Sequence, residues 1–147
     1  MEFKDEFNII KGEKIELKIL YCDEGDNEEI PYYYYGIFLD GIKKSIGKIS
    51  IRIGHNYHSY FNGNIGFEID GEYQGNHYAY EAAKLVIPVA KAHNMDYVII
   101  TCNKSNVASS KTIEKLRAKL IEEVDPPQDY LFYFEGIETH KIYRLDI

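Results

Sequence analysis

A polar loop that runs into an amphipathic segment carries the clearest chemical signal in the sequence. The stretch IDGEYQGNHYAYEAAK, residues 69–84, follows an apolar segment and has glycines at positions 71 and 75. From His77 onward, apolar residues recur at helical spacing. The first turn of a helix presents unpaired N–H groups and the positive end of the helix dipole, which favour anions such as phosphate. Two glycines before a helix are more often only a turn, so this pattern alone leaves both interpretations open.

The segments around this loop predict a mixed sheet. Alternating or continuous apolar runs predict strands at residues 14–20, 32–41, 44–54, 65–70, 97–102, 119–124, 130–136 and 140–147. Asp40-Gly41 predicts a hairpin turn, and residues 55–64 read as a loop. Residues 32–70 are therefore expected to form an antiparallel meander.

Two helices are expected in the second half of the chain. The first spans His77–His93 and is predicted to kink or break at Pro88, with Asn94 as a left-handed cap. The second lies within residues 103–120, with Ser105 or Asn106 as its N-cap. Because a helix joins the strands at 65–70 and 97–102, these two strands are expected to be parallel. The fold class is thus α+β, in one domain over residues 1–147.

Bulk composition excludes several functions. Seventeen Lys and Arg against 24 Asp and Glu give a net charge of −7, which argues against nucleic acid as a partner and weakly favours a cationic or neutral substrate. No segment reads as a signal peptide or a membrane span, so we expect a cytoplasmic protein with no membrane partner. Cys22 and Cys102 have neither metal nor disulfide-scaffold spacing. His55 and His58 alone are a poor metal site, and no metal is expected.

Two motifs together resemble the GNAT acetyltransferases. QGNHYAYEA resembles the family's acyl-CoA loop, Gln/Arg-x-x-Gly-x-Gly/Ala, through Gln74, Gly75 and Ala79, although His77 stands where glycine is expected. ITCNKSNVASSKTIEKL resembles the strand and Asn-x-x-Ser of the branch that includes ribosomal-protein N-terminal acetyltransferases, and Asn106 and Ser109 take those positions. The resemblance spans roughly residues 33–124. It implies the GNAT fold, a mostly antiparallel sheet with a parallel central pair flanked by helices.

The resemblance also implies a coenzyme site, with acetyl-CoA as co-substrate. Backbone amides of the loop would hold its pyrophosphate, the strand before the loop would pair with the pantetheine, and Asn106 would orient the pantetheine arm. We hypothesise that the His77 imidazole adds a partly charged donor to the phosphate site. The residues implied in coenzyme binding are Phe67, Ile69, Gln74, Gly75, Asn76, His77, Tyr78, Ala79 and Asn106.

The catalytic assignments follow from the same resemblance. Glu68, beside the predicted thioester, is the candidate base for the acceptor amine, and its alternative is a plain surface carboxylate. Ser109 is the candidate group near the leaving sulfur, with a helix-face serine as the alternative. Many members carry a tyrosine seven residues after the Asn, where this chain has Ile113. The acid that protonates the thiol is therefore open.

Four consecutive tyrosines, Tyr32–Tyr35, occupy the predicted second strand. We expect one face of this strand to support the core and the other to line the acceptor cleft, where aromatic rings attract cations. Tyr33, Tyr35 and Tyr60 are the predicted substrate contacts, although a fully packed strand is an equally open reading. The connection CDEGDNEEIP is shorter than the one or two helices that the family normally has there, which leaves the acceptor side open.

The leading interpretation is an acetyl-CoA-dependent N-acetyltransferase that acts directly on a primary amine of a small molecule or peptide. The alternative is a non-catalytic coenzyme A-binding module with a regulatory or interaction role. A structural protein with a chance loop match is a third, disfavoured by the paired motifs. Exposed sheet edges also make a homodimer plausible.

Overall fold

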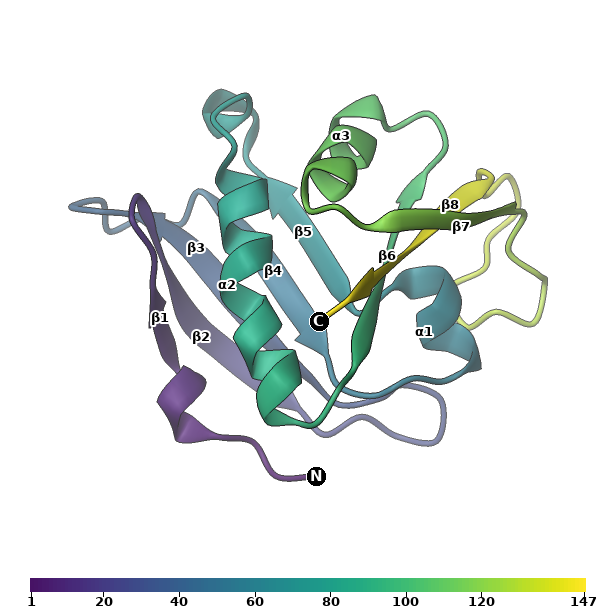
Figure 1. Ribbon diagram of the computed structural model, residues 1–147, viewed down its shortest axis with the longest axis horizontal. Helices are drawn as coiled ribbons and strands as arrows, with labels where there is room; N and C mark the ends of the chain where they lie inside the picture. The colour runs from purple at the N-terminus through teal and green to yellow at the C-terminus, as the bar shows by residue number, and fades with distance from the viewer.

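One eight-stranded mixed sheet forms the centre of the computed structural model, which describes residues 1–147 (Figure 1). The strand order is β1-β2-β3-β4-β5-β6-β8-β7, and every neighbouring pair is antiparallel except β5–β6. The strands are β1 (Ile9–Lys11), β2 (Ile15–Asp23), β3 (Tyr32–Leu39), β4 (Gly47–Arg52), β5 (Ile65–Ile69), β6 (Tyr97–Asn103), β7 (Lys119–Val124) and β8 (His140–Asp146). The expected mixed sheet with a parallel central pair is confirmed.

Three α-helices and two short 3₁₀ helices complete the fold. They are α1 (Tyr57–Asn62), α2 (Tyr78–Ala92), α3 (Val107–Lys115) and 3₁₀ turns at Asp5–Phe7 and Gly71–Tyr73. In Figure 1, α2 crosses one face of the sheet formed by β1–β5, and α3 lies near the N-terminal end of α2. None of the helices has the length and apolarity needed to cross a membrane.

The main core lies between the sheet and α2. Its sheet side is built from alternate residues that pair across the strands, such as Leu17, Ile37, Ile49 and Ile51, all 0% exposed. Its helix side is a stripe of small and β-branched residues at helical spacing: Ala82, Ala83, Val86, Val89 and Ala90. Small side chains let the helix axis approach the sheet closely, so this face is sealed.

Two local predictions are wrong, and of the kink or break expected at Pro88 the break is absent. Residues 55–64 are not all loop, because α1 forms within them under a capping box: Asn56 Oδ1 accepts from the Ser59 N–H, and the Asn56 N–H donates to Ser59 Oγ. Residues 130–136 form turns rather than a strand. Helix α2 does not break at Pro88, whose ring is on the solvent side, so the Lys84 carbonyl that it leaves unpaired is close to water.

Other local features follow the sequence closely. Asn94 adopts φ 64°, the left-handed conformation expected just after α2. Asn106 is the N-cap of α3, and its side chain accepts from the Ser109 N–H at 3.1 Å. The connection between β2 and β3 contains no helix, as the short acidic segment indicates.

Candidate active site

A cleft of about 530 Å³ opens where the β5 end, the following loop, α2 and α3 meet. The structure brings most of the predicted coenzyme and catalytic residues to its walls: Phe67, Glu68, Ile69, Gln74, Gly75, His77, Tyr78, Ala79, Asn106 and Ser109. Asn76 is the exception, since its side-chain amide folds back onto the Tyr73 and Gln74 carbonyls. Residues far apart in the sequence therefore share one concave surface.

The cleft lies along β5, beside a split between the two parallel strands. β5 pairs with β4 over its whole length but with β6 only at Ile65–Ile100. Beyond this point β6 pairs only with β8. The two parallel strands therefore diverge, and the edge of β5 toward the loop has no strand beside it.

Asn64 holds the closed end of this split. Its side chain is 0% exposed and makes three hydrogen bonds: Nδ2 donates to the Arg52 and Gly54 carbonyls, and Oδ1 accepts from the Ile99 N–H. Its backbone N–H also donates to the Ile99 carbonyl. One buried amide thus ties β4, β5 and β6 together where the split begins. Sequence reasoning missed Asn64, although a polar residue before an apolar strand is a usable signal.

The free edge of β5 presents backbone groups to the cleft. Asp70 N–H donates to the Ile46 carbonyl and Arg52 N–H donates to the Asn64 carbonyl, which fixes the alternation of the antiparallel ladder. By this alternation Glu68 pairs with β4, while the backbone N–H and C=O of Phe67 and Ile69 face the split. The Ile69 carbonyl already accepts from Gln74 Nε2 at 2.9 Å, so the loop is tied to the strand end.

The N-terminus of α2 differs from the other two helix starts. Asn56 and Asn106 cap α1 and α3 with their side chains, whereas the N-cap of α2, His77, makes no side-chain cap bond. His77 has φ 63° and ψ 18°, the left-handed conformation that glycine adopts most easily. The chain therefore makes this left-handed turn with a residue larger than glycine. The first amides of α2 are left without a side-chain acceptor, at the mouth of the cleft.

Two lysines on α3 supply positive charge along the same cleft. Lys111 and Lys115 lie one helical turn apart and both line it. Lys115 Nζ lies 4.4 Å from the centre of the Tyr80 ring and 3.4 Å from His77 Nδ1. An ammonium has no acceptor, so Nδ1 is the acceptor in this contact. Neither lysine takes part in the three ion pairs of the chain. The i, i+4 spacing could have revealed this pair.

The tyrosine strand is oriented opposite to the prediction. Tyr33 and Tyr35 are 0% exposed and face the α2 side, and the Tyr35 hydroxyl donates to the Phe7 carbonyl. They have no surface to offer a substrate, so their assignment as substrate contacts is wrong. Tyr32 and Tyr34 are half-buried on the other face of the sheet. The ring centres of Tyr21 and Tyr34 lie 5.1 Å apart. Both faces of this strand are aromatic in sequence, so periodicity alone could not choose between them.

Tyr60 lies elsewhere. Its hydroxyl donates to Glu122 of β7, and its ring lines a separate cavity of about 280 Å³ beside α1 and β6. None of the residues of this cavity lines the cleft between β5, α2 and α3. Burial, together with this hydrogen bond, raises the pKa of Tyr60 to about 12. The structure does not bring Tyr60 to the cleft.

His55, His58 and Cys102, which the sequence analysis also considered, have packing or hydrogen-bond partners within the fold. His55 stacks on Tyr97 with ring centres 4.1 Å apart, and His58 Nδ1 accepts from the Leu131 N–H. No group of three or more His, Cys, Asp or Glu side chains gathers as a metal site. Cys102 is buried in the main core, and burial raises the pKa of its thiol.

Comparisons with known proteins agree with this geometry. Residues 13–119 match the family model described as an acetyltransferase (GNAT) domain. A Vibrio cholerae protein named as a candidate ribosomal-protein-serine acetyltransferase superposes with a TM-score of 0.67 at 17% identity, over 95% of this chain and 97% of that one. The ribosomal-protein-S5-alanine acetyltransferase of Vibrio fischeri gives 0.62 at 23% identity, over 78% and 61%.

A third solved structure contains the coenzyme. It is RimL, a ribosomal L7/L12 alpha-N-protein acetyltransferase in complex with coenzyme A, with a TM-score of 0.60 at 19% identity over 79% of this chain and 62% of that one. This chain thus spans about three-fifths of the length of the RimL and S5-alanine enzymes. At these low identities, the three superpositions show a shared fold and nothing more. No curated protein sequence matches the chain. The family match covers well over half of the residues, and the chain belongs to the GNAT acetyltransferase family.

Proposed function

We propose that this protein is an N-acetyltransferase that moves an acetyl group from acetyl-CoA directly to a primary amine of a small molecule or peptide. The split between β5 and β6 carries this proposal, because beyond Ile65–Ile100 no strand pairing lies between the cleft and the opposite face of the sheet. A thioester held in the split is then accessible from one side to its carrier and from the other to an amine. Membership of the GNAT family and the coenzyme A complex of RimL support the choice of coenzyme.

The cleft offers hydrogen-bonding groups that suit the coenzyme. The uncapped amides at the start of α2 would bind its diphosphate, and the backbone of Phe67 would offer a donor and an acceptor to the amides of the pantetheine arm. Lys111 and Lys115 balance the phosphate charge from α3. Asn106 retains Nδ2 as a free donor, because its Oδ1 caps the helix. When bound, the coenzyme supplies the activated acetyl group.

Glu68 is positioned to handle the proton of the acceptor. Glu68 pairs with Lys48 of β4, and its side chain is on the face of the sheet away from α2. Glu68 is exposed beside the split. An amine arrives as ammonium and must lose a proton before its nitrogen can attack the acetyl carbonyl. We propose that the Glu68 carboxylate accepts this proton. The new C–N bond forms as the C–S bond breaks. Ser109, half-buried in the cleft wall, is the candidate donor of a proton to the departing thiolate, and its hydroxyl regains a proton from the second one that the amine nitrogen loses as it becomes an amide.

A non-catalytic coenzyme-binding module remains the second candidate function. Two observations favour it: His77 replaces the loop glycine, and Ile113, where many relatives carry a tyrosine, is 0% exposed in the main core. Ile113 therefore leaves no side chain near the sulfur from that position.

Two measurements separate these functions. Calorimetric titration with coenzyme A tests the cleft itself, and Lys115→Ala, with Lys91→Ala on the exposed side of α2 as its control, locates the binding. We expect binding that Lys115→Ala weakens about tenfold, as for loss of a charged contact. Release of free thiol from acetyl-CoA with a panel of amines then tests catalysis. Binding without any amine-dependent thiol release would favour the non-catalytic module, and no binding would remove both.

A further inference from the structure

The face of the sheet opposite α2 contains polar groups that the proposed reaction does not use. Ser50 and Arg52 of β4 and Gly66 of β5 share this face with Glu68, because they alternate with the core residues Ile49, Ile51 and Ile65. Tyr34 lies opposite Ser50 and Tyr32 lies opposite Arg52 on β3. An amine that approaches Glu68 from this side must pass over these residues.

Arg52 is a half-buried guanidinium with few partners. Its one side-chain hydrogen bond is a long one, Nη1 to the Gly63 carbonyl at 3.5 Å, although a guanidinium has five donors. It takes no part in the three ion pairs of the chain. Its carbon Cζ lies 5.6 Å from the centre of the Tyr32 ring, which orients the plane of the group. Burial lowers the pKa of Arg52, and the charge of Glu29 only partly opposes this effect.

Ser50 and Arg52 converge on the open spot above Gly66. A methyl carbon placed on Gly66 would stand 3.3 Å from Ser50 Oγ and 3.7 Å from Arg52 Nη1. Ser50 is only 7% exposed, and its hydroxyl has no hydrogen-bond partner within the protein. Two polar groups, one charged and one neutral, therefore surround a space the size of a single atom. An oxygen at this place would accept from both after a shift of a few tenths of an ångström.

We propose that this place binds an oxyanion of the acceptor, so that the acceptor is an amine that carries a carboxylate or phosphate a few bonds away. The proposal rests on the N-acetyltransferase function proposed above. Gly66 lies two residues before Glu68, or about 7 Å along the strand. The oxyanion over Gly66 thus sets the amine near Glu68 and the split. An α-amino acid or an aminoalkyl phosphate has these two groups at short spacing, whereas a polyamine lacks the anion.

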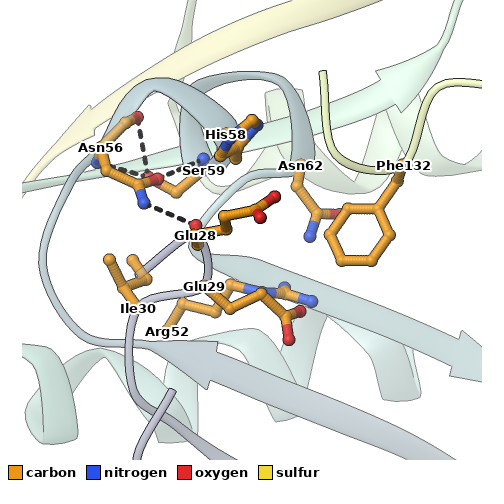
Figure 2. Close-up of a pocket in the computed structure, with 9 residues that line it drawn as sticks. All are labelled: Glu28, Glu29, Ile30, Arg52, Asn56, His58, Ser59, Asn62 and Phe132. Carbon is orange, nitrogen blue, oxygen red and sulfur yellow. Dashed lines mark hydrogen bonds between the residues drawn. The ribbon is translucent and has the colours of Figure 1, made fainter. Parts of the chain in front are cut away.

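The carboxylates around Arg52 set a limit on this site. Figure 2 shows Glu28 and Glu29 of the β2–β3 connection, together with Asn56, His58 and Phe132, around the small pocket that Arg52 lines. Glu28 and Glu29 line this pocket together with Arg52, whereas Gly66 does not line it. Arg52 can therefore keep Glu29 as a nearby countercharge while its Nη1 faces the acceptor. The two acids also select against a second anionic group on the acceptor.

Matched acceptor pairs test the proposal by activity. L-alanine is compared with L-alaninamide, and phosphoethanolamine with ethanolamine, in thiol-release assays that give kcat/KM for each. We expect the anionic member of at least one pair to be preferred, and the pair that shows the preference identifies carboxylate or phosphate. Arg52→Gln should reduce kcat/KM for that anionic acceptor about 10- to 100-fold, as for loss of a charged hydrogen bond, and change the neutral acceptor little.

Two further variants separate binding from folding. Gly66→Ala fills the oxyanion spot while retaining Arg52, and the Ser50 hydroxyl can rotate away from the new methyl, so the fold should hold and the anionic preference should fall. Lys18→Gln is the control, because Lys18 makes a similar cation–ring contact, 4.9 Å from Phe38, on the same face but two strands from β4. Its kcat/KM ratios should match the wild type.

A binding experiment decides the matter independently of turnover. With coenzyme A saturating, calorimetry compares N-acetyl-L-alanine with its amide and acetylphosphoethanolamine with acetylethanolamine. Tighter binding of an anionic product, lost in Arg52→Gln and Gly66→Ala, supports the oxyanion site. Equal affinities within both pairs, or equal affinities in both variants and wild type, overturn it. If no amine is acetylated, the proposed enzymatic function fails, and this binding comparison still decides whether the oxyanion site exists.

Discussion

The two faces of the sheet at the split differ in how they are built. On the α2 side, helices α2 and α3 flank a cleft whose binding groups are mostly backbone amides, with lysines at the rim. On the opposite side, β2 to β5 carry no helix, and side chains of tyrosine, serine, arginine and glutamate face outward. Backbone recognition tolerates changes in side chains, whereas side-chain recognition does not. On the proposed function, the first face would hold the coenzyme and the second would hold the acceptor.

Glu68→Gln should have the largest effect, because it should lower turnover strongly while it leaves coenzyme A affinity unchanged. Loss of a general base lowers kcat by about 10²- to 10⁴-fold, while the backbone of residue 68, which pairs with β4, remains in place. Coenzyme A affinity should be nearly unchanged. Stopped assays for turnover and calorimetry for affinity measure the two effects on the same sample. Unchanged turnover would remove Glu68 from the mechanism, and a large loss of coenzyme affinity would mean that the faces are not independent.

Asn64→Ala should test whether the closed end of the split is a structural requirement of both faces. The change leaves three backbone groups without their side-chain partner in a fully buried place, which costs about 3 kcal/mol or more of the free energy of unfolding. Urea unfolding measures it. Asn76→Ala, in which only an exposed amide is lost, is the control and should change stability by less than about 0.5 kcal/mol. A small loss at position 64 would show that water replaces these bonds.

The neighbouring tyrosines offer the finest comparison, because they lie next to each other on one strand and face opposite ways. Tyr35→Phe removes a buried hydroxyl from the Phe7 carbonyl and should cost about 1 kcal/mol of stability without changing acceptor KM. Tyr34→Ala removes a ring from the open face and should raise acceptor KM about two- to tenfold. Steady-state kinetics beside urea unfolding measures both. An effect of Tyr35→Phe on KM at unchanged stability would restore the prediction that the structure overturns.

Most of the coenzyme side could be predicted from the sequence because its signals are local. The loop, the helix start and the Asn-x-x-Ser segment each lie within a few residues, and the apolar period of the following helix sets its buried face. A local signal was not always sufficient. The capping box of Asn56 and Ser59 is local, yet the helix that it starts, YHSYFN, consists of aromatic and polar residues with no apolar period. Its Phe61 ring packs against the buried Tyr130, which is far away in the sequence.

What the sequence determined by itself is the series of strands β2 to β5, the helices α2 and α3, the parallel pair at the crossover and the loop before α2, since each depends on periodicity or on a turn between neighbours. Tertiary structure decided which face of Tyr32–Tyr35 meets α2, because an alternation that is aromatic on both sides gives no preference until the helix packs on one of them. It also brought Ser50, Arg52 and Gly66 into one place. Their positions depend on strand register between β4 and β5, which pairing across the sheet fixes and no single segment encodes.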